Sequence, residues 1–244
     1  MSPTPWVTAV IVTLTFIGIA VGRYPIIKSN RTTIALMGVA LLILSGQIDF
    51  NRLSAYVDFD TLILLFSMMI INANLKLAGF FLLAGRLLVR LARSPRAFLA
   101  LEILLVGLLS ALFLNDTICL MFAPFLIELM NRLKRNPLPY LVALATAANV
   151  GSTATLTGNP QNMIVGIASG IPYAQFALTL APLAIFGLAV VWIVLVLMYP
   201  RDLRRGDGFD PPEEDEISVS RPLLGKTLVI ACGLLAAFLA GVPI

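Results

Sequence analysis

Long apolar segments alternate with short polar clusters along this chain of 244 residues. A helix needs about 20 apolar residues to cross the roughly 30 Å of hydrocarbon in a bilayer. Apolar segments close to this length run over residues 6–21, 32–48, 61–77 and 173–199, and another begins at residue 226. This pattern predicts an all-α polytopic membrane protein, surrounded by the lipid bilayer of an inner or plasma membrane.

Residues 97–131 form an apolar stretch without Lys or Arg that differs from a plain crossing. Its middle is the polar triplet Asn115-Asp116-Thr117. Two full crossings and a turn would need more than about 40 residues. Each arm here has only about 14–18 residues, or about 21–27 Å as helix. We therefore expect a re-entrant helical hairpin whose tip ends inside the membrane, where protein or a watery cavity must cover its backbone.

Residues 138–171 contain no charged side chain, yet they do not read as one continuous helix. A polar run from Asn149 to Asn162 interrupts them, and Gly151, Gly158 and Pro160 within it disfavour helix. The pattern predicts a short helix over 138–148, the polar run, and a second short helix over 163–169. Together these segments make one broken crossing.

Charged residues make up 12% of the chain, about half their share in an ordinary soluble domain. This scarcity excludes a soluble enzyme, and the absence of His excludes His acid–base chemistry and His metal ligands. The basic residues lie in short clusters between apolar segments, which argues against binding of nucleic acid. With the N-terminus outside, all 17 Lys and Arg except Arg52 fall on the cytoplasmic side, in agreement with the positive-inside rule.

The spacing of these segments predicts the domain organisation. Basic residues at helical spacing over 79–91 predict an amphipathic helix on the inner membrane surface, with an extension of the third crossing as the alternative. Residues 201–225 are polar and acidic and predict a flexible cytoplasmic linker.

Five crossings precede that linker, and an odd number means that a second copy would insert upside down, as in inverted-repeat transporters. Residues 1–200 are therefore expected to form the first repeat, and residues 226–244 the first helix of an incomplete second repeat. The expected partners are the missing second repeat and a second copy of the chain in a homodimer.

Asp116 is the acid that the pattern places deepest in the membrane. An Asp at a helix centre costs about 2.5–3.5 kcal/mol on insertion scales, so it needs a compensating role. It could coordinate Na⁺ or carry a proton, or else Asp116 or Asn115 could cap the second arm of the hairpin. By contrast, Glu102 and Glu128 lie 12–14 residues from the tip, about 20 Å back along the arms. We expect both at the cytoplasmic membrane interface.

The polar run supplies hydroxyls and amides but no charge. Two helix ends should meet there, one presenting N–H groups to an anion and the other presenting carbonyls to a cation. The alternative is a polar break that only satisfies its own hydrogen bonds.

The motifs Asn115-Asp116-Thr117, Ala148 to Thr155, and Gly158-Asn159-Pro160-Gln161-Asn162 resemble those of the ion transporter superfamily. That group includes arsenite permeases, citrate and dicarboxylate carriers, and some Na⁺/H⁺ antiporters. The resemblance, taken with the polar run, implies two sets of ligands. The substrate-binding candidates are Asp116, Thr117, Thr155, Thr157, Asn159, Pro160, Gln161 and Asn162. The candidate ligands of the coupling cation are Asn115, Asp116, Asn149 and Gly158.

The sequence departs from the superfamily's divalent-anion symporters at two positions, with Asp at 116 in place of Asn and Asn at 159 in place of Thr. A carboxylate beside the substrate would repel a dianion, which leaves arsenite-like anions, inorganic anions and cation exchange open.

The sequence thus predicts a secondary active transporter for a small anion or oxyanion of arsenite, citrate or dicarboxylate type. It would work by alternating access, coupled to Na⁺ or H⁺ and without a cofactor. A Na⁺/H⁺ antiporter that uses Asp116 is the first alternative, and a non-transporting half-transporter that serves as a membrane partner protein is the second. An intramembrane enzyme is disfavoured because the chain has one deep Asp, no His, and no Lys near the polar run.

Overall fold

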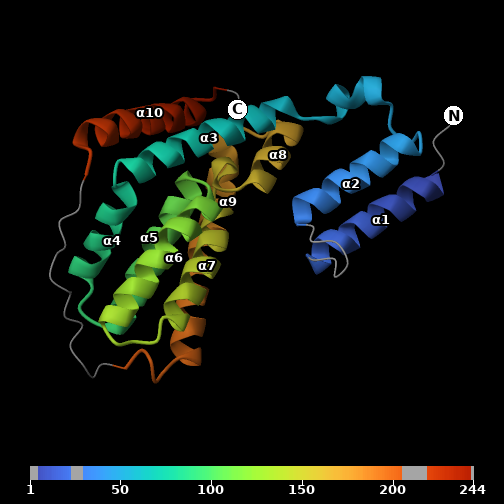
Figure 1. Ribbon diagram of the computed structural model, residues 1–244. Helices are drawn as coiled ribbons and strands as arrows, with labels where there is room; N and C mark the ends of the chain where they lie inside the picture. Colours follow the sequence, from blue (N-terminus) through green and yellow to red (C-terminus); the bar gives the residue numbers. More distant parts are fainter. Residues whose placement is uncertain (1–4, 23–29, 205–218, 243–244) are drawn as a thin grey trace. The chain divides into compact units, whose positions relative to one another are not determined.

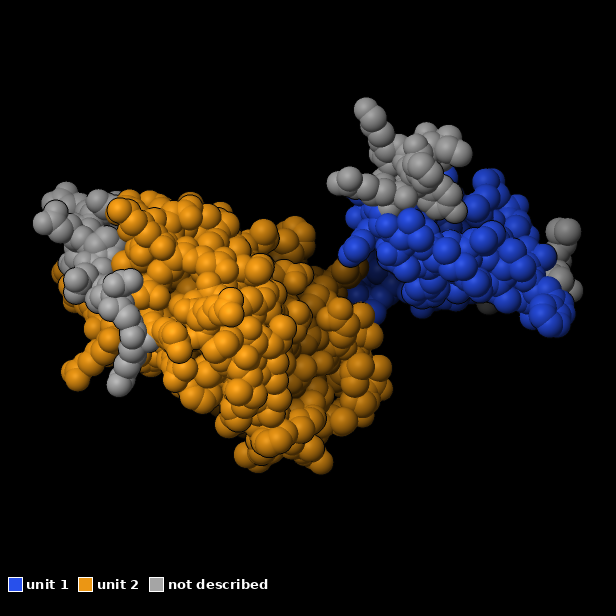
Figure 2. All heavy atoms as spheres, turned by 90° about the horizontal axis from the view of Figure 1, so that it is seen from below, with its two compact units in different colours: residues 1–59 blue, residues 60–244 orange. Residues whose placement is uncertain are grey.

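The computed structural model describes residues 5–22, 30–204 and 219–242, and the regular structure in these ranges is helical (Figure 1). They form two compact units, residues 1–59 and residues 60–244, which Figure 2 colours separately. The expectation of an all-α polytopic membrane protein is confirmed. Four described helices are long and apolar enough to cross a membrane.

The first unit contains α1 (Pro5–Val21), α2 (Arg31–Leu44) and a short 3₁₀ helix, η1 (Phe50–Tyr56). Asn30 begins α2, because its Oδ1 accepts the N–H of Thr33 at 2.9 Å. The crossing predicted over 32–48 was too long, since α2 ends at Leu44 and Gly46 follows with a positive φ of 70°. With 14 residues, α2 is about 21 Å long.

The second unit contains the remaining elements. They are α3 (Phe59–Leu77), α4 (Phe80–Leu91), α5 (Pro95–Leu112), α6 (Asn115–Arg132), α7 (Leu138–Ser152), η2 (Leu156–Gly158), α8 (Pro160–Ser169), α9 (Tyr173–Met198) and α10 (Arg221–Leu239). The candidate crossing helices are α3, α5, α9 and α10. The crossings predicted over 61–77 and 173–199 correspond closely to α3 and α9.

The break between α3 and α4 falls at Gly79, which adopts a left-handed φ of 82°. Glycine takes this conformation without steric cost, so the chain turns there. The alternative of one continuous helix through 79–91 is therefore wrong. α4 buries Phe81, Leu88 and Val89 against its neighbours and leaves Arg90 exposed. Its place on the inner membrane surface stays a prediction.

α5 and α7 form the central pair of the second unit. The rings of Phe98 and Tyr140 meet edge to face, with their centroids 5.4 Å apart. Further along, a Cβ on Gly151 would lie 2.3 Å from the carbonyl oxygen of Gly107. These contacts advance in the same direction on both helices, so α5 and α7 run parallel. The glycine pair allows the two backbones to approach each other closely.

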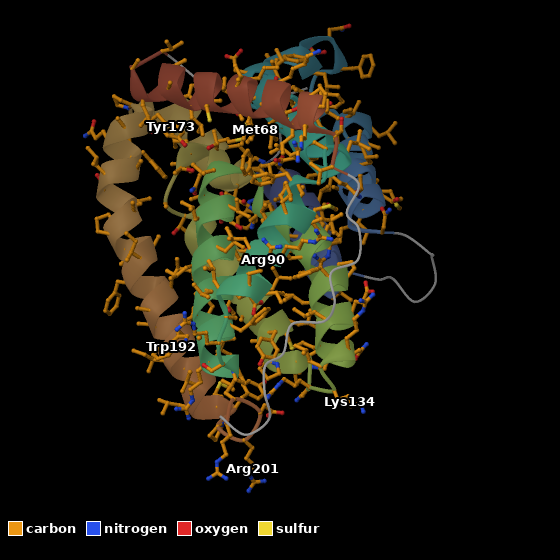
Figure 3. All side chains as sticks on the ribbon, turned by 90° about the vertical axis from the view of Figure 1, so that its left-hand side faces the viewer. Met68, Arg90, Lys134, Tyr173, Trp192 and Arg201 are labelled. Atoms are coloured by element: carbon orange, nitrogen blue, oxygen red, sulfur yellow. The ribbon has the colours of Figure 1, made fainter. Side chains whose placement is uncertain are left out.

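Several polar contacts fasten one end of this unit. Arg135 Nη1 donates to the backbone carbonyl of Asp202 at 3.3 Å. Asn136 Nδ2 donates to the carboxylate of the same residue at 3.2 Å. Trp192 Nε1 donates to the carbonyl of Arg96 at 3.4 Å. Figure 3 shows Lys134 and Arg201 at this same end, and Met68 and Tyr173 at the opposite end. Lys134, Arg135 and Arg201 therefore lie at one end, and the assignment of this end to the cytoplasm stays a prediction. α10, which carries Arg221 and Lys226, packs at the opposite end, against Met68 and Tyr173.

The C-terminal boundary differs from the one predicted. α10 begins at Arg221 and not at residue 226, because Pro222 occupies its first turn, where proline favours a helix start. The linker predicted over 201–225 is therefore shorter, and its residues 205–218 lie outside the described part of the chain. The assignment of residues 1–200 and 226–244 to two repeats stays a prediction.

Candidate functional site

The two predicted helix breaks meet in the second unit. α5 ends at Leu112 and α6 begins at Asn115, so Phe113 and Leu114 make the turn between them. The two helices lie side by side (Figure 1). Each has 18 residues, or about 27 Å, and α5 is itself long and apolar enough to cross a membrane. The structure thus contains the helical pair, while its re-entry into the membrane stays a prediction.

Direct hydrogen bonds join this turn to the broken crossing. Asn115 Nδ2 donates to Asn149 Oδ1 at 3.1 Å, and Thr155 Oγ1 donates to the carbonyl of Ala111. Two residues that were predicted as cation ligands from separate motifs, Asn115 and Asn149, are therefore in contact. This contact brings the two motifs into one site.

Asp116 lies in the first turn of α6, and its side chain is exposed. The alternative that Asp116 or Asn115 caps this helix is wrong, because Leu114 occupies the cap position and no side chain caps it. Asn115 Oδ1 instead accepts the N–H of Asp116 at 2.9 Å. A carboxylate in the first turn of a helix interacts favourably with the helix dipole, so this position suits an acidic side chain.

Asn72 of α3 is a site residue that we did not assign from the sequence. Its side chain is 1% exposed, and its Nδ2 donates to Thr117 Oγ1 at 3.4 Å. Its Oδ1 is buried and has no partner among the described residues. The signal in the sequence is an amide within an otherwise apolar crossing, where polar side chains often bond between helices.

The broken crossing consists of α7, η2 and α8, with the helices extending closer to each other than predicted. α7 continues to Ser152 and not to residue 148, and α8 starts at Pro160 and not at residue 163. Asn159 caps α8, since its Oδ1 accepts the N–H of Asn162 at 2.8 Å. A proline in the first helical turn is favoured because it needs no hydrogen-bond partner there.

Two amides close this break internally. Asn159 Nδ2 donates to the carbonyl of Ser152 at 3.3 Å and to Ser152 Oγ at 3.1 Å. Asn162 Nδ2 donates to the carbonyls of Thr155 and Ser152, at 2.8 and 3.2 Å. Both amides therefore satisfy carbonyls at or just beyond the end of α7, which helix geometry leaves without partners.

Gly158 and Thr157 are buried within the same break. A Cβ on Gly158 would lie 2.2 Å from the carbonyl oxygen of Ser152, so only glycine fits there. The hydroxyl of Thr157 is 3.0 Å from the hydroxyl of Tyr173 on α9. By contrast, Gln161 is exposed on the first turn of α8.

The described residues contain no group of three or more His, Cys, Asp or Glu side chains that could hold a metal ion. A cation at this site would therefore be bound by amide, hydroxyl and carbonyl oxygens together with Asp116. These hard oxygen ligands suit Na⁺ better than a transition metal.

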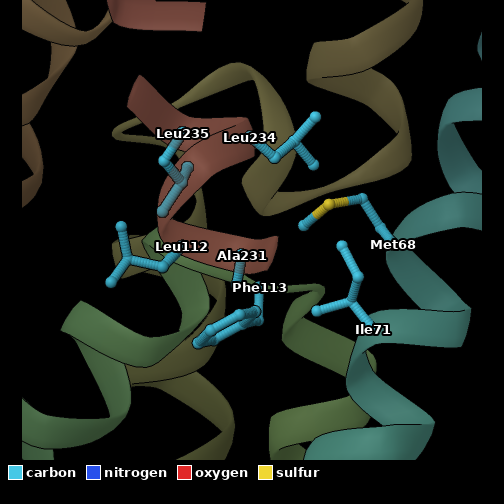
Figure 4. Close-up of a pocket in the computed structure, with 7 residues that line it drawn as sticks. All are labelled: Met68, Ile71, Leu112, Phe113, Ala231, Leu234 and Leu235. Atoms are coloured by element: carbon cyan, nitrogen blue, oxygen red, sulfur yellow. The ribbon is translucent and has the colours of Figure 1, made fainter. Parts of the chain in front are cut away.

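The small pocket between α3, the α5–α6 turn and α10 is a different place (Figure 4). Its lining is entirely apolar and comprises Met68, Ile71, Leu112, Phe113, Ala231, Leu234 and Leu235. Without a polar side chain to orient a charged solute, this pocket does not account for anion binding.

The two glutamates of the helical pair differ from each other in the structure. Glu128 is exposed and forms an ion pair with Arg132 at 2.7 Å, and its place at the membrane interface stays a prediction. The interfacial placement of Glu102 was wrong, because its side chain is 0% exposed. Positions 98, 102 and 106 lie on one face of α5, and all three are fully buried.

The family model described as citrate transporter matches residues 6–244. The chain belongs to the citrate transporter family. Its resemblance to the ion transporter superfamily is thereby confirmed.

Three relatives of this member of the citrate transporter family show how similar it is to other proteins. A silicon efflux transporter of Oryza sativa subsp. japonica is 36% identical over 182 residues, which cover 75% of this chain and 38% of the relative. An uncharacterised transporter of Mycobacterium tuberculosis is 32% identical over 239 residues, covering 92% and 55%. The inner membrane protein YbiR of Escherichia coli is 35% identical over 131 residues, covering 53% and 35%.

The chain spans about half the length, or less, of the curated relatives that it matches. These family relationships establish a multi-pass membrane protein of a transporter family that carries anions, and they agree with the expectation that the chain is not an enzyme.

Proposed function

We propose that this chain provides one substrate and coupling-ion site of a secondary active transporter for a small oxyanion or its weak oxyacid. The observation that carries the proposal is the contact between Asn115 and Asn149. It joins two helix interruptions inside one helical unit, and inverted-repeat transporters build their binding sites from such interruptions.

The substrate side of the site is the start of α8. Pro160 has no N–H, and the N–H of Asn162 is bonded to Asn159. The N–H of Gln161 is thus the first-turn donor without a partner in the described part of the chain, and the Gln161 side chain is exposed beside it. A helix N-terminus with a free donor attracts an oxyanion. Thr117 on α6 offers a further hydroxyl.

The cation side of the site is the start of α6. Asp116 supplies a carboxylate, while Asn115, Asn149 and the backbone of Gly158 supply neutral oxygens. Either Na⁺ or a proton on Asp116 would neutralise the carboxylate. The net charge of the site would therefore depend on whether the coupling ion is bound. This dependence would link the flux of the coupling ion to the flux of the substrate.

Asp116 also favours a weakly charged substrate. At roughly 5 Å and an effective dielectric constant near 20, its carboxylate would oppose each negative charge on the substrate by about 3 kcal/mol. Citrate carries several such charges, whereas arsenite and silicic acid are largely neutral acids near pH 7. The silicon efflux function named for the rice relative fits this preference. We therefore place weak oxyacids ahead of citrate and dicarboxylates.

The transport cycle would be alternating access. The whole assembly would include a second repeat of opposite orientation, because inverted-repeat transporters build their sites at the interface between repeats. We propose a homodimer of this assembly as a separate expectation. The N-terminus would lie outside, with the polar segment 201–220 in the cytoplasm, since this orientation places nearly all basic residues inside.

Uptake into proteoliposomes tests this function. Arsenite, silicic acid and citrate are offered separately to the reconstituted protein, with an imposed Na⁺ or pH gradient. We expect gradient-driven flux of a weak oxyacid, and we expect Asp116→Asn to abolish the flux or remove its dependence on the gradient. Glu128→Gln is the matched control, because it removes an exposed acid from the same helix.

Wild-type rates and unchanged gradient dependence in Asp116→Asn would remove Asp116 from the mechanism. A Na⁺/H⁺ antiporter is the second candidate, favoured by the exposure of the Asp116 carboxylate. It predicts that added Na⁺ dissipates a pH gradient in the absence of any oxyanion, which a pH-sensitive dye inside the vesicles would report.

A further inference from the structure

Glu102 is a fully buried acid that the transport site does not use. It lies in the middle of α5, its side chain is 0% exposed, and neither carboxyl oxygen has a hydrogen-bond partner among the described residues. An isolated carboxylate in an apolar environment is so unfavourable that the group takes up a proton instead. The described residues are sufficient to bury the Glu102 side chain completely.

No charged side chain in the described part of the chain forms a hydrogen bond with the carboxyl group of Glu102. Glu102 acts electrostatically on Tyr140 of α7, and Arg135 acts on the same side chain. The Tyr140 hydroxyl is also buried and has no hydrogen-bond partner among the described residues. The titratable side chains on the helices packed against α5 are Arg86 and Arg90 on α4, Asp116, Cys119, Glu128 and Arg132 on α6, Tyr140 on α7, and Tyr173 on α9. None of them forms a hydrogen bond with Glu102.

A second unpartnered group lies on α5 nearer the turn. Ser110 is buried, its Oγ has no partner among the described residues, and it follows Glu102 by two helical turns. Three polar groups without partners, Glu102, Tyr140 and Ser110, thus lie within the otherwise apolar interior around α5. Structural polar groups in such an interior are normally satisfied, so these groups call for an explanation other than packing.

We propose that Glu102 is a proton-binding site, occupied in this conformation and emptied when the packing around α5 opens to water. In the closed state the group is a neutral carboxylic acid. When the interior opens, its O–H bond breaks, the proton passes to water and a hydrated carboxylate remains. Closing the interior again requires that a proton be taken up. This inference rests on the proposed function only in that a transporter alternates between closed and open interiors.

A purely structural glutamic acid would look different. Its O–H would donate to a carbonyl or hydroxyl, and that hydrogen bond would offset the free-energy cost of burying the carboxyl group. Here the acid has no such partner, and a Leu of similar size would fill the same space with less cost. The unsatisfied carboxyl is instead suited to a group that is released to water in another state.

Infrared difference spectroscopy of the full chain in lipid vesicles tests this site directly. A pH step should produce a carboxylic C=O band that shifts on deuteration and on ¹³C labelling of glutamate. We expect the band to be lost in Glu102→Gln and retained in Glu128→Gln and Asp116→Asn. The ¹³C shift in the wild-type protein assigns the band to glutamate even if Glu102→Gln fails to fold.

Two results would overturn the inference. One is a titrating glutamate band that persists unchanged in Glu102→Gln. The other is a Glu102 carboxyl that never changes protonation with pH, which would make it a permanent structural acid. Failure of the transport proposal is distinguishable, because vesicles that carry none of arsenite, silicic acid or citrate can still show the Glu102 band.

Discussion

The close approach of α5 and α7 allows a quantitative test. In Gly151→Ala, the new Cβ would lie 2.3 Å from the carbonyl oxygen and 2.4 Å from the Cα of Gly107, about 1 Å short of ordinary contact. The obstacle is backbone, so no side chain can rotate away. The two helices must separate and loosen the fully buried packing of Val106 and Ala147. Overpacking of this kind typically costs about 1–3 kcal/mol.

Gly233→Ala on α10 is the matched control. Gly233 is also helical, but it is exposed and has nothing within 4 Å of a new Cβ. Both variants gain about 1 kcal/mol of helix propensity, so the difference between them isolates the helix contact. We expect Gly151→Ala to be less stable than Gly233→Ala by about 1–3 kcal/mol.

The assay is the fraction of folded protein recovered by size-exclusion chromatography after heating in detergent. For soluble chains of this size, each kcal/mol lowers the midpoint by about 2–4 °C. Equal midpoints for Gly151→Ala and Gly233→Ala would refute the close approach of α5 and α7.

Three further predictions concern the helix breaks. Asn115→Ala and Asn149→Ala should be coupled, so that the double variant loses about 0.5–1.5 kcal/mol less stability than the sum of the single variants; additive losses in the same heating assay would count against the hydrogen bond. Thr157→Val leaves the Tyr173 hydroxyl without its partner and should cost about 1–3 kcal/mol, and adding Tyr173→Phe should restore part of the loss, which thermal unfolding measures. Gly158→Ala should sharply lower the yield of folded, monodisperse protein, and a wild-type elution profile would contradict the tight fit at this glycine.

Much of the fold could be predicted because the length of an apolar segment and the residues that start or end a helix are local properties of the sequence. The bounds of α3 and α9, and the interruption between α7 and α8, follow from hydropathy and from glycine and proline positions. The helix boundaries that were missed also had local signals. Gly46 ends α2, and Pro222 starts α10 earlier than the apolar segment suggested.

The site could be predicted only in part, because side-chain partners depend on which helices pack together. Two motifs far apart in the sequence pointed to Asn115 and Asn149, and the structure joins them. Distance along α5 placed Glu102 about 20 Å from the hairpin tip, but it could not give the direction of the side chain, which the packing of α5 against α7 decides. Asn72 could not be assigned a role for the same reason, since its partner Thr117 lies on another helix.

The chain contains two cysteines, and their placement gives it a built-in reporter of access. Cys119 is half-buried on α6, one turn beyond the Asn115–Asp116 pair, while Cys232 is exposed on α10. Replacing Cys232 with Ser would leave a single native thiol beside the candidate site. Charged thiol reagents that cannot cross the bilayer, added to one side at a time, would then show from which side of the membrane water reaches Cys119.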